Sequence, residues 1–160
     1  MTLWPDSCDV RRSFVPEIHR ISTNVFEGDG QYPLNIGLEV FGTGSGRVVY
    51  DISDYATVPA VLKVAYNDSG HHENINERTD RDTWAEPLRE RLVPVTDSFS
   101  DGLAVVQPMV ETPLEWGCVQ EAKDELSGIV EQAGGHPREV QRQNIGRFQD
   151  TFVLLDHGDI

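Results

Sequence analysis

Lys63 is the residue whose surroundings most strongly suggest chemistry. It lies in the segment VLKVA, and it shares the chain with one other lysine, Lys123, and eleven arginines. An ammonium group on an apolar strand needs a carboxylate or a phosphate as a partner, because its desolvation is otherwise uncompensated. The alternative is a lysine that snorkels from a sheet edge. Arginine, which is far commoner in this chain, could snorkel equally well, but its charge is spread over a planar fork. The presence of a scarce lysine at this position therefore favours a specific role for its point charge.

Two glutamates downstream are candidate partners for this ammonium. Residues 71–86 are charged and contain neither Pro nor Gly, which predicts an exposed helix that Pro87 terminates. Glu73 and Glu77 lie one helical turn apart on the same face, so either carboxylate could turn toward the strand that carries Lys63.

A glycine cluster, GTGSG, precedes this strand and spans Gly42 to Gly46. Glycines let backbone amides approach a phosphate without an intervening side chain. A nucleotide P-loop needs Gly-Lys and then a helix, whereas Gly46 is followed by Arg47 and a β-branched run. A dinucleotide fingerprint also requires a following helix. Two interpretations remain, a hairpin that covers phosphates and a hairpin turn without a ligand.

Seven segments rich in β-forming residues and bounded by turn residues predict strands. They are NIGLEVF, RVVYDI, VPAVLKVAY, LVPVTDSF, GLAVVQPM, NIGRF and TFVLLD. The first three are expected to form an antiparallel meander, and the next two a hairpin across Ser100 to Gly102. The last two are short strands around Gln149 and Asp150. Such a pattern predicts an α+β fold.

Helices are predicted at three places. Residues 1–33 are expected to form a short helix or two followed by a loop, and the helix over 71–86 has Ile75 and Trp84 as inward candidates. Apolar residues from Val119 to Val130 recur at steps of three and four, which predicts an amphipathic helix that ends at Gly134 and Gly135. The stretch HPREVQRQ is expected to be a turn or a short helix.

Composition narrows the class of protein. The 160 residues suit one domain, and 13 basic against 27 acidic residues give a net charge of −14. This charge repels nucleic-acid backbones and anionic membranes, so neither is an expected partner. Cys8 and Cys118 have no companions at metal spacing, and the sequence shows no signal peptide or membrane span. We therefore expect a cytoplasmic protein, adapted to high salt by its excess of carboxylates.

Taken together, the ordered motifs resemble the protein kinase superfamily. GTGSGRVVYD, VLKVA, NINE on a helix and a hairpin that ends in VVQPM are similar to its small lobe. NIGRF and VLLDHGD resemble its catalytic-loop asparagine and its Asp-Phe-Gly motif, with His157 in place of Phe. The likeness covers about residues 36–160.

The resemblance implies a site that binds ATP with Mg²⁺, and it assigns roles to individual residues. The implied roles are phosphate cover for Gly42, Gly44 and Gly46, phosphate binding for Lys63 paired with Glu77, Mg²⁺ binding for Asn144 and Asp156, adenine contact around Gln107 in the hinge, and the catalytic-base position for Glu139.

The chain departs from the family pattern at several points. The glycine loop is one residue shorter than the family's spacing. Glu139 replaces the usual Asp, and its extra methylene shifts the carboxylate by roughly 1–1.5 Å, enough to cost about 10²-fold in rate. His136 is an alternative base. Because two residues follow Gly158, we expect neither an activation segment nor a helical large lobe.

We therefore expect a reduced kinase-like fold, similar to small kinase-like proteins of viruses and phages. An N-terminal extension over 1–34 precedes a kinase-like domain over 35–160, whose small-lobe-like part, an antiparallel sheet with a helix, ends at 110. The part over 111–160 is a minimal remnant of the large lobe, a helix with a β-hairpin. The expected function is binding of ATP and Mg²⁺. If the protein is catalytically active, the expected reaction is phosphoryl transfer. The alternatives are a noncatalytic pseudokinase that binds a protein partner or a second copy of itself, and an acidic α+β domain whose motifs are coincidental.

Overall fold

The computed structural model describes residues 3–28, 37–156 and 160, and the fold is α+β. The chain divides into two compact units. The sheet unit comprises Pro5–Asn76 and Val95–Pro108, and the hairpin unit comprises Glu77–Pro94 and Met109–Ile160 with the residues up to Trp4. Each unit contains its own apolar core.

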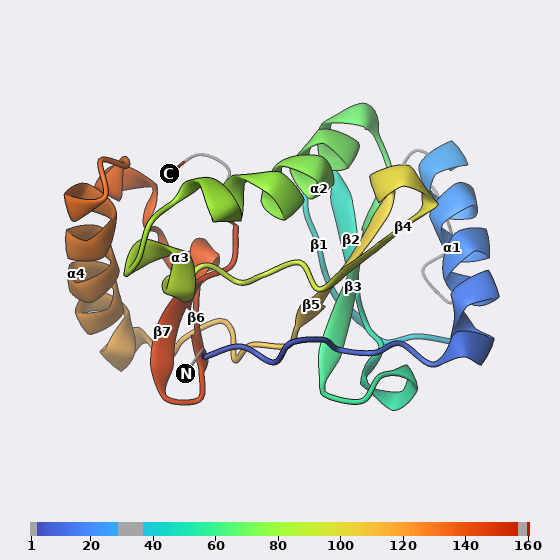
Figure 1. Cartoon of the computed structure of the whole chain (residues 1–160), viewed down its shortest axis with the longest axis horizontal. Coiled ribbons are helices and arrows are strands. Elements are labelled where there is room, and N and C mark those ends of the chain that lie inside the picture. Colours follow the sequence, from blue (N-terminus) through green and yellow to red (C-terminus); the bar gives the residue numbers. More distant parts are fainter. Residues whose placement is uncertain (1–2, 29–36, 157–159) are drawn as a thin grey trace. The chain divides into compact units, whose positions relative to one another are not determined.

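The sheet unit contains one sheet of five antiparallel strands (Figure 1). In spatial order they are β1 (Val40–Thr43), β2 (Arg47–Asp51), β3 (Ala60–Ala65), β5 (Ala104–Pro108) and β4 (Asp97–Phe99). The predicted meander is thus confirmed for β1, β2 and β3, and so is the predicted pairing of β4 with β5. The connection between β4 and β5 turns through three residues with positive φ, Ser100, Asp101 and Gly102.

Helix α1 (Val15–Glu27) packs on one face of this sheet. Its Ile18, Ile21 and Val25 recur at helical spacing and are fully buried. They join Leu62 and Val64 of β3 in the core of the unit. Burial of each such aliphatic side chain contributes roughly 1.5–3 kcal/mol to stability. The region before residue 34 therefore supplies a helix to the same core as the sheet.

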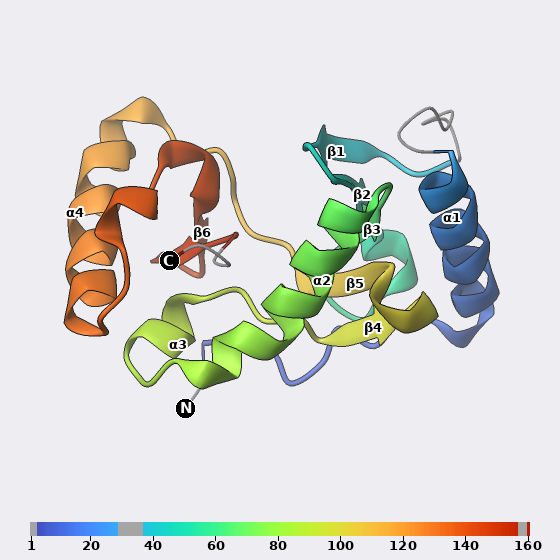
Figure 2. The same ribbon diagram turned by 90° about the horizontal axis from the view of Figure 1, so that it is seen from above.

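Helix α2 (Asp68–Asp80) follows β3, and its N-terminal part lies on the other side of the sheet from α1 (Figure 2). The helix begins three residues before the predicted start, because Asn67 caps it. The Asn67 Oδ1 accepts the amide of Gly70 at 2.9 Å. Residues 67–70 are thus the cap and first turn of α2. The helix ends at Asp80, and a 3-10 turn over Arg81–Thr83 follows.

The hairpin unit contains α3 (Leu88–Arg91), α4 (Trp116–Gln132) and the antiparallel strands β6 (Ile145–Phe148) and β7 (Thr151–Leu154). Gln149 and Asp150 turn the hairpin with positive φ. Helix α4 packs against β7, and Val119, Ala122, Leu126 and Val130 form its buried stripe. The predicted spacing is confirmed, and Gly134, with φ of 86°, lies just beyond the helix.

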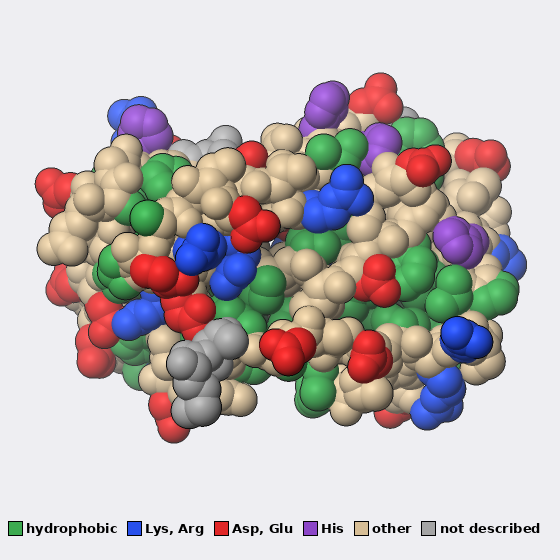
Figure 3. All heavy atoms as spheres, in the orientation of Figure 1, with side chains coloured by type: hydrophobic (Ala, Val, Ile, Leu, Met, Phe, Trp, Pro, Cys, Tyr) green, Lys and Arg blue, Asp and Glu red, His purple; other side chains and the backbone are tan. Residues whose placement is uncertain are grey.

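Acidic side chains are spread over the face drawn in Figure 3 and do not gather in one patch. None of the described helices is long and apolar enough to cross a membrane. Both cysteines are free thiols.

Candidate functional site

Lys63 lies on the central strand of the sheet, not at an edge. In the sheet, Lys63 is paired with Val49 of β2 on one side and with Val105 of β5 on the other. As the alternation of the strand predicted, it points away from the face on which Leu62 and Val64 join the core. Its side chain is only 8% exposed. A lysine that snorkels from a sheet edge does not fit this position.

Gln107 lies on the same face of the sheet as Lys63. It is paired with Val61, two residues before Lys63 on β3, and directly opposed residues in an antiparallel pair share a face. The Gln107 side chain is 1% exposed. The side-chain amide of Gln107 is therefore buried on this face of the sheet. The resemblance to kinases implied a different role, in which the backbone around Gln107 forms a hinge that binds adenine.

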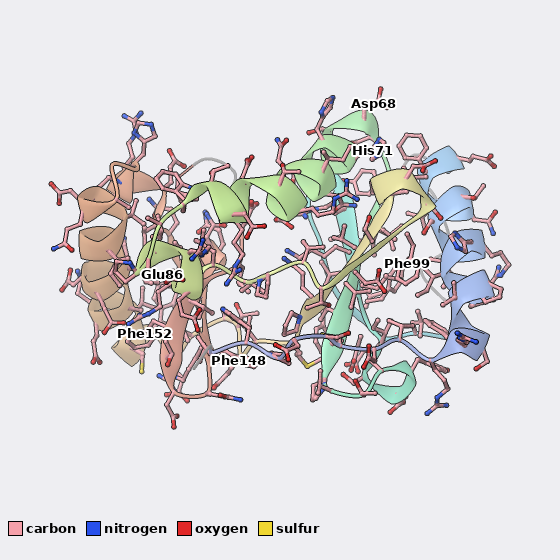
Figure 4. All side chains as sticks on the ribbon, viewed as in Figure 1. Asp68, His71, Glu86, Phe99, Phe148 and Phe152 are labelled. Carbon is pink, nitrogen blue, oxygen red and sulfur yellow. The ribbon has the colours of Figure 1, made fainter. Side chains whose placement is uncertain are left out.

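The buried face of α2 contains no apolar residue. Gly70, Asn74 and Glu77, at positions i, i+4 and i+7, are its fully buried residues, whereas the predicted inward residue Ile75 is half-buried. Trp84, the other predicted inward residue, lies beyond α2 and packs half-buried on the hairpin unit's core. Figure 4 labels Asp68 and His71 in the first turns of this helix.

The two candidate partners of Lys63 have different environments. The Glu73 carboxylate lies 3.2 Å from Nε of Arg47, so it forms an ion pair with another cation of the sheet. Glu77 is 1% exposed on the part of α2 that belongs to the hairpin unit. The pairing of Glu77 with Lys63 stays a prediction.

The glycine cluster forms the turn between β1 and β2, and Gly46 has a structural role there. A Cβ on Gly46 would lie 2.7 Å from the amide nitrogen of Gly70, so the two backbones are in contact. The Tyr66 amide and the Asn67 side chain donate to the carbonyls of Gly46 and Ser45, at 2.9 and 3.0 Å. The connection from β3 to α2 thus fixes the turn.

Packing does not explain the other two glycines. A Cβ on Gly42 would meet no atom within 4 Å, and one on Gly44 would only touch the Arg47 carbonyl at 4.0 Å. Gly42 and Gly44 are also exposed. Phosphate cover at these two positions stays a prediction.

Asn144 joins the two segments that carry the other predicted residues of the hairpin unit, Glu139 and Asp156. Its Nδ2 donates to the carbonyl of Glu139 at 3.2 Å. Its backbone carbonyl accepts the amide of Leu155 at 2.8 Å, directly before Asp156. One asparagine therefore joins the loop that carries Glu139 to the end of β7. His157 and Gly158, which complete the motif resembling Asp-Phe-Gly, lie outside the described residues.

The chemistry of this cluster fits a hard cation. Because Nδ2 of Asn144 is a donor to Glu139, Oδ1 of the same amide is the atom that can bind a cation. Asp156 is exposed and supplies a carboxylate, and oxygen ligands of these two kinds suit Mg²⁺. Over residues 3–28, 37–156 and 160, no three His, Cys, Asp or Glu residues gather closely enough to hold a metal by themselves.

Glu139 is half-buried beside an exposed arginine. The Arg138 Nε lies 3.8 Å from Oε1 of Glu139, at a position where solvent screens the pair. The neighbouring His136 is exposed, and its backbone amide donates to the carbonyl of Ile160 at 2.6 Å. No hydrogen bond of the His136 ring is seen in the part of the chain that the structure describes.

Sequence reasoning missed Arg47 and Asn74, both of which are buried. Nη1 of Arg47 donates to Oδ1 of Asn74 at 3.1 Å. The sequence held one signal for them, since an asparagine halfway between a small residue and a glutamate at i, i+4 and i+7 marks a polar helix face.

Within each unit, the structure thus brings a subset of the predicted residues together. Lys63 and Gln107 share a sheet face, and Glu139, Asn144 and Asp156 lie around one loop. No family model matches the chain, and no curated protein is significantly similar to it.

Proposed function

We propose that this protein binds ATP together with Mg²⁺, as a reduced kinase-like protein. The observation that carries the proposal is the burial of Lys63 on the central strand of an antiparallel sheet, with a helix directly after that strand. Kinases place their phosphate-binding lysine on the third strand and its glutamate partner on the following helix. In this chain the third strand carries Lys63 and the next helix carries Glu77.

The net charge of −14 supports a specific contact between a cationic side chain and the phosphates. A triphosphate approaching this chain is repelled by the net charge, so it needs local positive charge to bind. Lys63 supplies a point charge that the sheet holds in place, and the accompanying Mg²⁺ neutralises further charge. Asn144 and Asp156 are the proposed ligands of that ion, and the orientation of the Asn144 amide supports this role.

Phosphoryl transfer would require one residue more than nucleotide binding does, a general base. In the active form, Glu139 accepts the proton of the attacking hydroxyl, and the loop that holds it is tied to Asn144 through the 3.2 Å hydrogen bond. The half-exposed position of Glu139 leaves it accessible to a hydroxyl-bearing acceptor. Binding and transfer are therefore separable properties.

The two lysines provide a matched test of nucleotide binding. We expect MgATP at a hundredfold excess over its dissociation constant to stabilise the wild-type protein by about 2.7 kcal/mol in a thermal-shift assay at molar salt. Lys63→Met removes the phosphate contact and should abolish the shift, whereas Lys123→Met on α4 should retain it. Asp156→Asn should lose the Mg²⁺ dependence of the shift. An equal shift in Lys63→Met and wild type would contradict the proposal.

A second candidate, the noncatalytic pseudokinase, is favoured by one exposed surface residue. Trp116 at the start of α4 is 74% exposed, and the guanidinium of Arg142 stacks on its ring at 3.8 Å. Two nitrogens of Arg142 also donate to the Leu114 carbonyl, which holds the pair in place. Trp and Arg are the residues most enriched at interaction hot spots. A stoichiometric complex that ATP leaves unchanged and Trp116→Ala abolishes would favour this candidate.

A further inference from the structure

The attachment of α2 to the sheet depends on polar groups, which is unusual for a surface helix. Such a helix normally buries an apolar stripe at positions i, i+4 and i+7. In α2 these positions are Gly70, Asn74 and Glu77, and all three are buried. Hydrogen bonds and close backbone contact must therefore fix the helix where apolar packing would otherwise do so.

The first contact is made by glycine backbones. A Cβ on Gly70 would lie 1.9 Å from the Gly46 carbonyl oxygen, so only a glycine allows the first turn of α2 to come this close. The ring of His71 adds a hydrogen bond from Nε2 to the Asp101 carbonyl at 2.8 Å. These contacts fix the beginning of the helix against the turns at one end of the sheet.

The second contact is the side chain of Asn74, which joins α2 to the connection from β4 to β5 and to β2. Its Nδ2 donates to the carbonyls of Gly102 and Leu103, at 3.0 and 3.1 Å. Its Oδ1 accepts Nη1 of Arg47 at 3.1 Å. The Leu103 carbonyl also accepts the amide of Ala65 on β3, so Asn74 completes a network that joins β2, β3 and the connection from β4 to β5.

Asn74 also reaches the backbone of the candidate lysine. The carbonyls of Gly102 and Leu103 already take its two N–H donors, and its Nδ2 also lies 3.5 Å from the carbonyl oxygen of Lys63, which is a close contact and not a third full hydrogen bond. The site therefore needs a residue that donates and accepts at once, and asparagine does both. An aspartate of the same shape would turn a second acceptor toward carbonyl oxygens and place a buried charge there.

We propose that Asn74 is a positioning residue for the candidate nucleotide site. It fixes α2 to the carbonyls of Gly102 and Leu103, next to the backbone of Lys63, and Arg47 supports it by binding both Asn74 and Glu73. This inference rests on the proposed function for its link to ATP, but the geometry at Lys63 can be measured without a nucleotide.

The experiment compares Asn74→Asp with Asn76→Asp, which adds the same charge at an exposed position of the same helix. Labelling lysine at Cε with ¹³C gives two signals, one each from Lys63 and Lys123. We expect Asn74→Asp to shift the Lys63 signal without nucleotide and leave the Lys123 signal in place. MgATP affinity should fall about 10- to 100-fold in Asn74→Asp and stay within about twofold in Asn76→Asp.

Arg47→Lys provides a second variant in case Asn74→Asp does not fold. It retains the positive charge and adds a third lysine signal, but it cannot bind Asn74 and Glu73 through one planar fork, so it should shift the Lys63 signal in the same way. A folded Asn74→Asp or Arg47→Lys protein with an unchanged Lys63 signal and wild-type MgATP affinity would overturn the inference. If wild type itself fails to bind MgATP, the proposed function is wrong, and the Lys63 signal alone then decides whether Asn74 positions Lys63.

Discussion

At the scale of single residues, the two cysteines lie in different environments. Cys8 is 1% exposed, and burial raises the pKa of its thiol, an effect that a side-chain hydrogen bond with Thr96 only partly offsets. Cys118 is half-buried, and Nη2 of Arg147 lies 3.3 Å from its sulfur. Because the thiolate is the reactive form, a raised pKa and burial both slow modification of Cys8.

We therefore expect a thiol reagent at pH 8 to modify Cys118 first. Cys8 should react more slowly by a factor on the order of 100, because access requires local opening of the sheet unit. Mass spectrometry of peptides over a time course measures both rates, with a sample unfolded in denaturant as the control in which the rates converge. Equal rates in the native protein would contradict the burial of Cys8.

The sequence predicted the strand and the sheet face of Lys63 but not the residues that surround it. The alternation of VLKVA fixed the face to which Lys63 points, since the strand period is two. The roles of Arg47 and Asn74 depend on how β2, α2 and the connection from β4 to β5 pack together. The one local signal, the polar face of α2, does not encode that packing. Asn144 is intermediate, because the resemblance to a kinase motif implied a metal ligand there but not the hydrogen bond with Glu139.

At the scale of elements, two helical glycines provide a test of how α2 is attached. Alanine stabilises a helix interior relative to glycine by about 1 kcal/mol when the new methyl group meets open space. A Cβ on Gly128 of α4 meets no atom within 4 Å, whereas one on Gly70 meets the Gly46 backbone. The same substitution should therefore have opposite effects in the two helices.

We expect Gly128→Ala to raise the free energy of unfolding by about 0.5–1 kcal/mol and Gly70→Ala to lower it by roughly 1–3 kcal/mol. Chemical denaturation with a common slope measures both changes. Two stabilised variants would show that the close contact between Gly70 and Gly46 does not exist in solution.

The elements themselves were predicted to different degrees. The strands and α4 followed from β-branched runs and from apolar spacing, which are strong local signals. The start of α2 was missed because Asp68, Ser69 and Gly70 favour turns, and only the cap from Asn67 together with the contact to Gly46 makes them helical. A helix held by polar groups has no apolar period that a sequence pattern could detect.

At the scale of the whole molecule, the net charge of −14 predicts a dependence on salt. Repulsion among carboxylates destabilises the compact state, and added salt screens that repulsion. We expect the midpoint of thermal unfolding to rise by roughly 5 °C between 0.1 and 2 M KCl, which corresponds to on the order of 1–2 kcal/mol for a chain of this size.

Sucrose at matched osmolality is the control for this salt effect, because it stabilises proteins by exclusion from their surface but does not screen charge. A midpoint that rises equally in sucrose and in KCl, or that falls in KCl, would show that screening of the acidic surface does not stabilise this protein.

The central claim is that the buried ammonium of Lys63 contacts the phosphates of a nucleotide. A titration of the wild-type protein with MgATP at molar salt, followed by the ¹³Cε signals of its two lysines, tests this claim most directly. The account predicts that the Lys63 signal moves in a saturable way with one equivalent of MgATP, while the Lys123 signal stays where it is. If neither signal moves, or both move together without saturation, Lys63 does not bind a nucleotide and the proposed function is wrong.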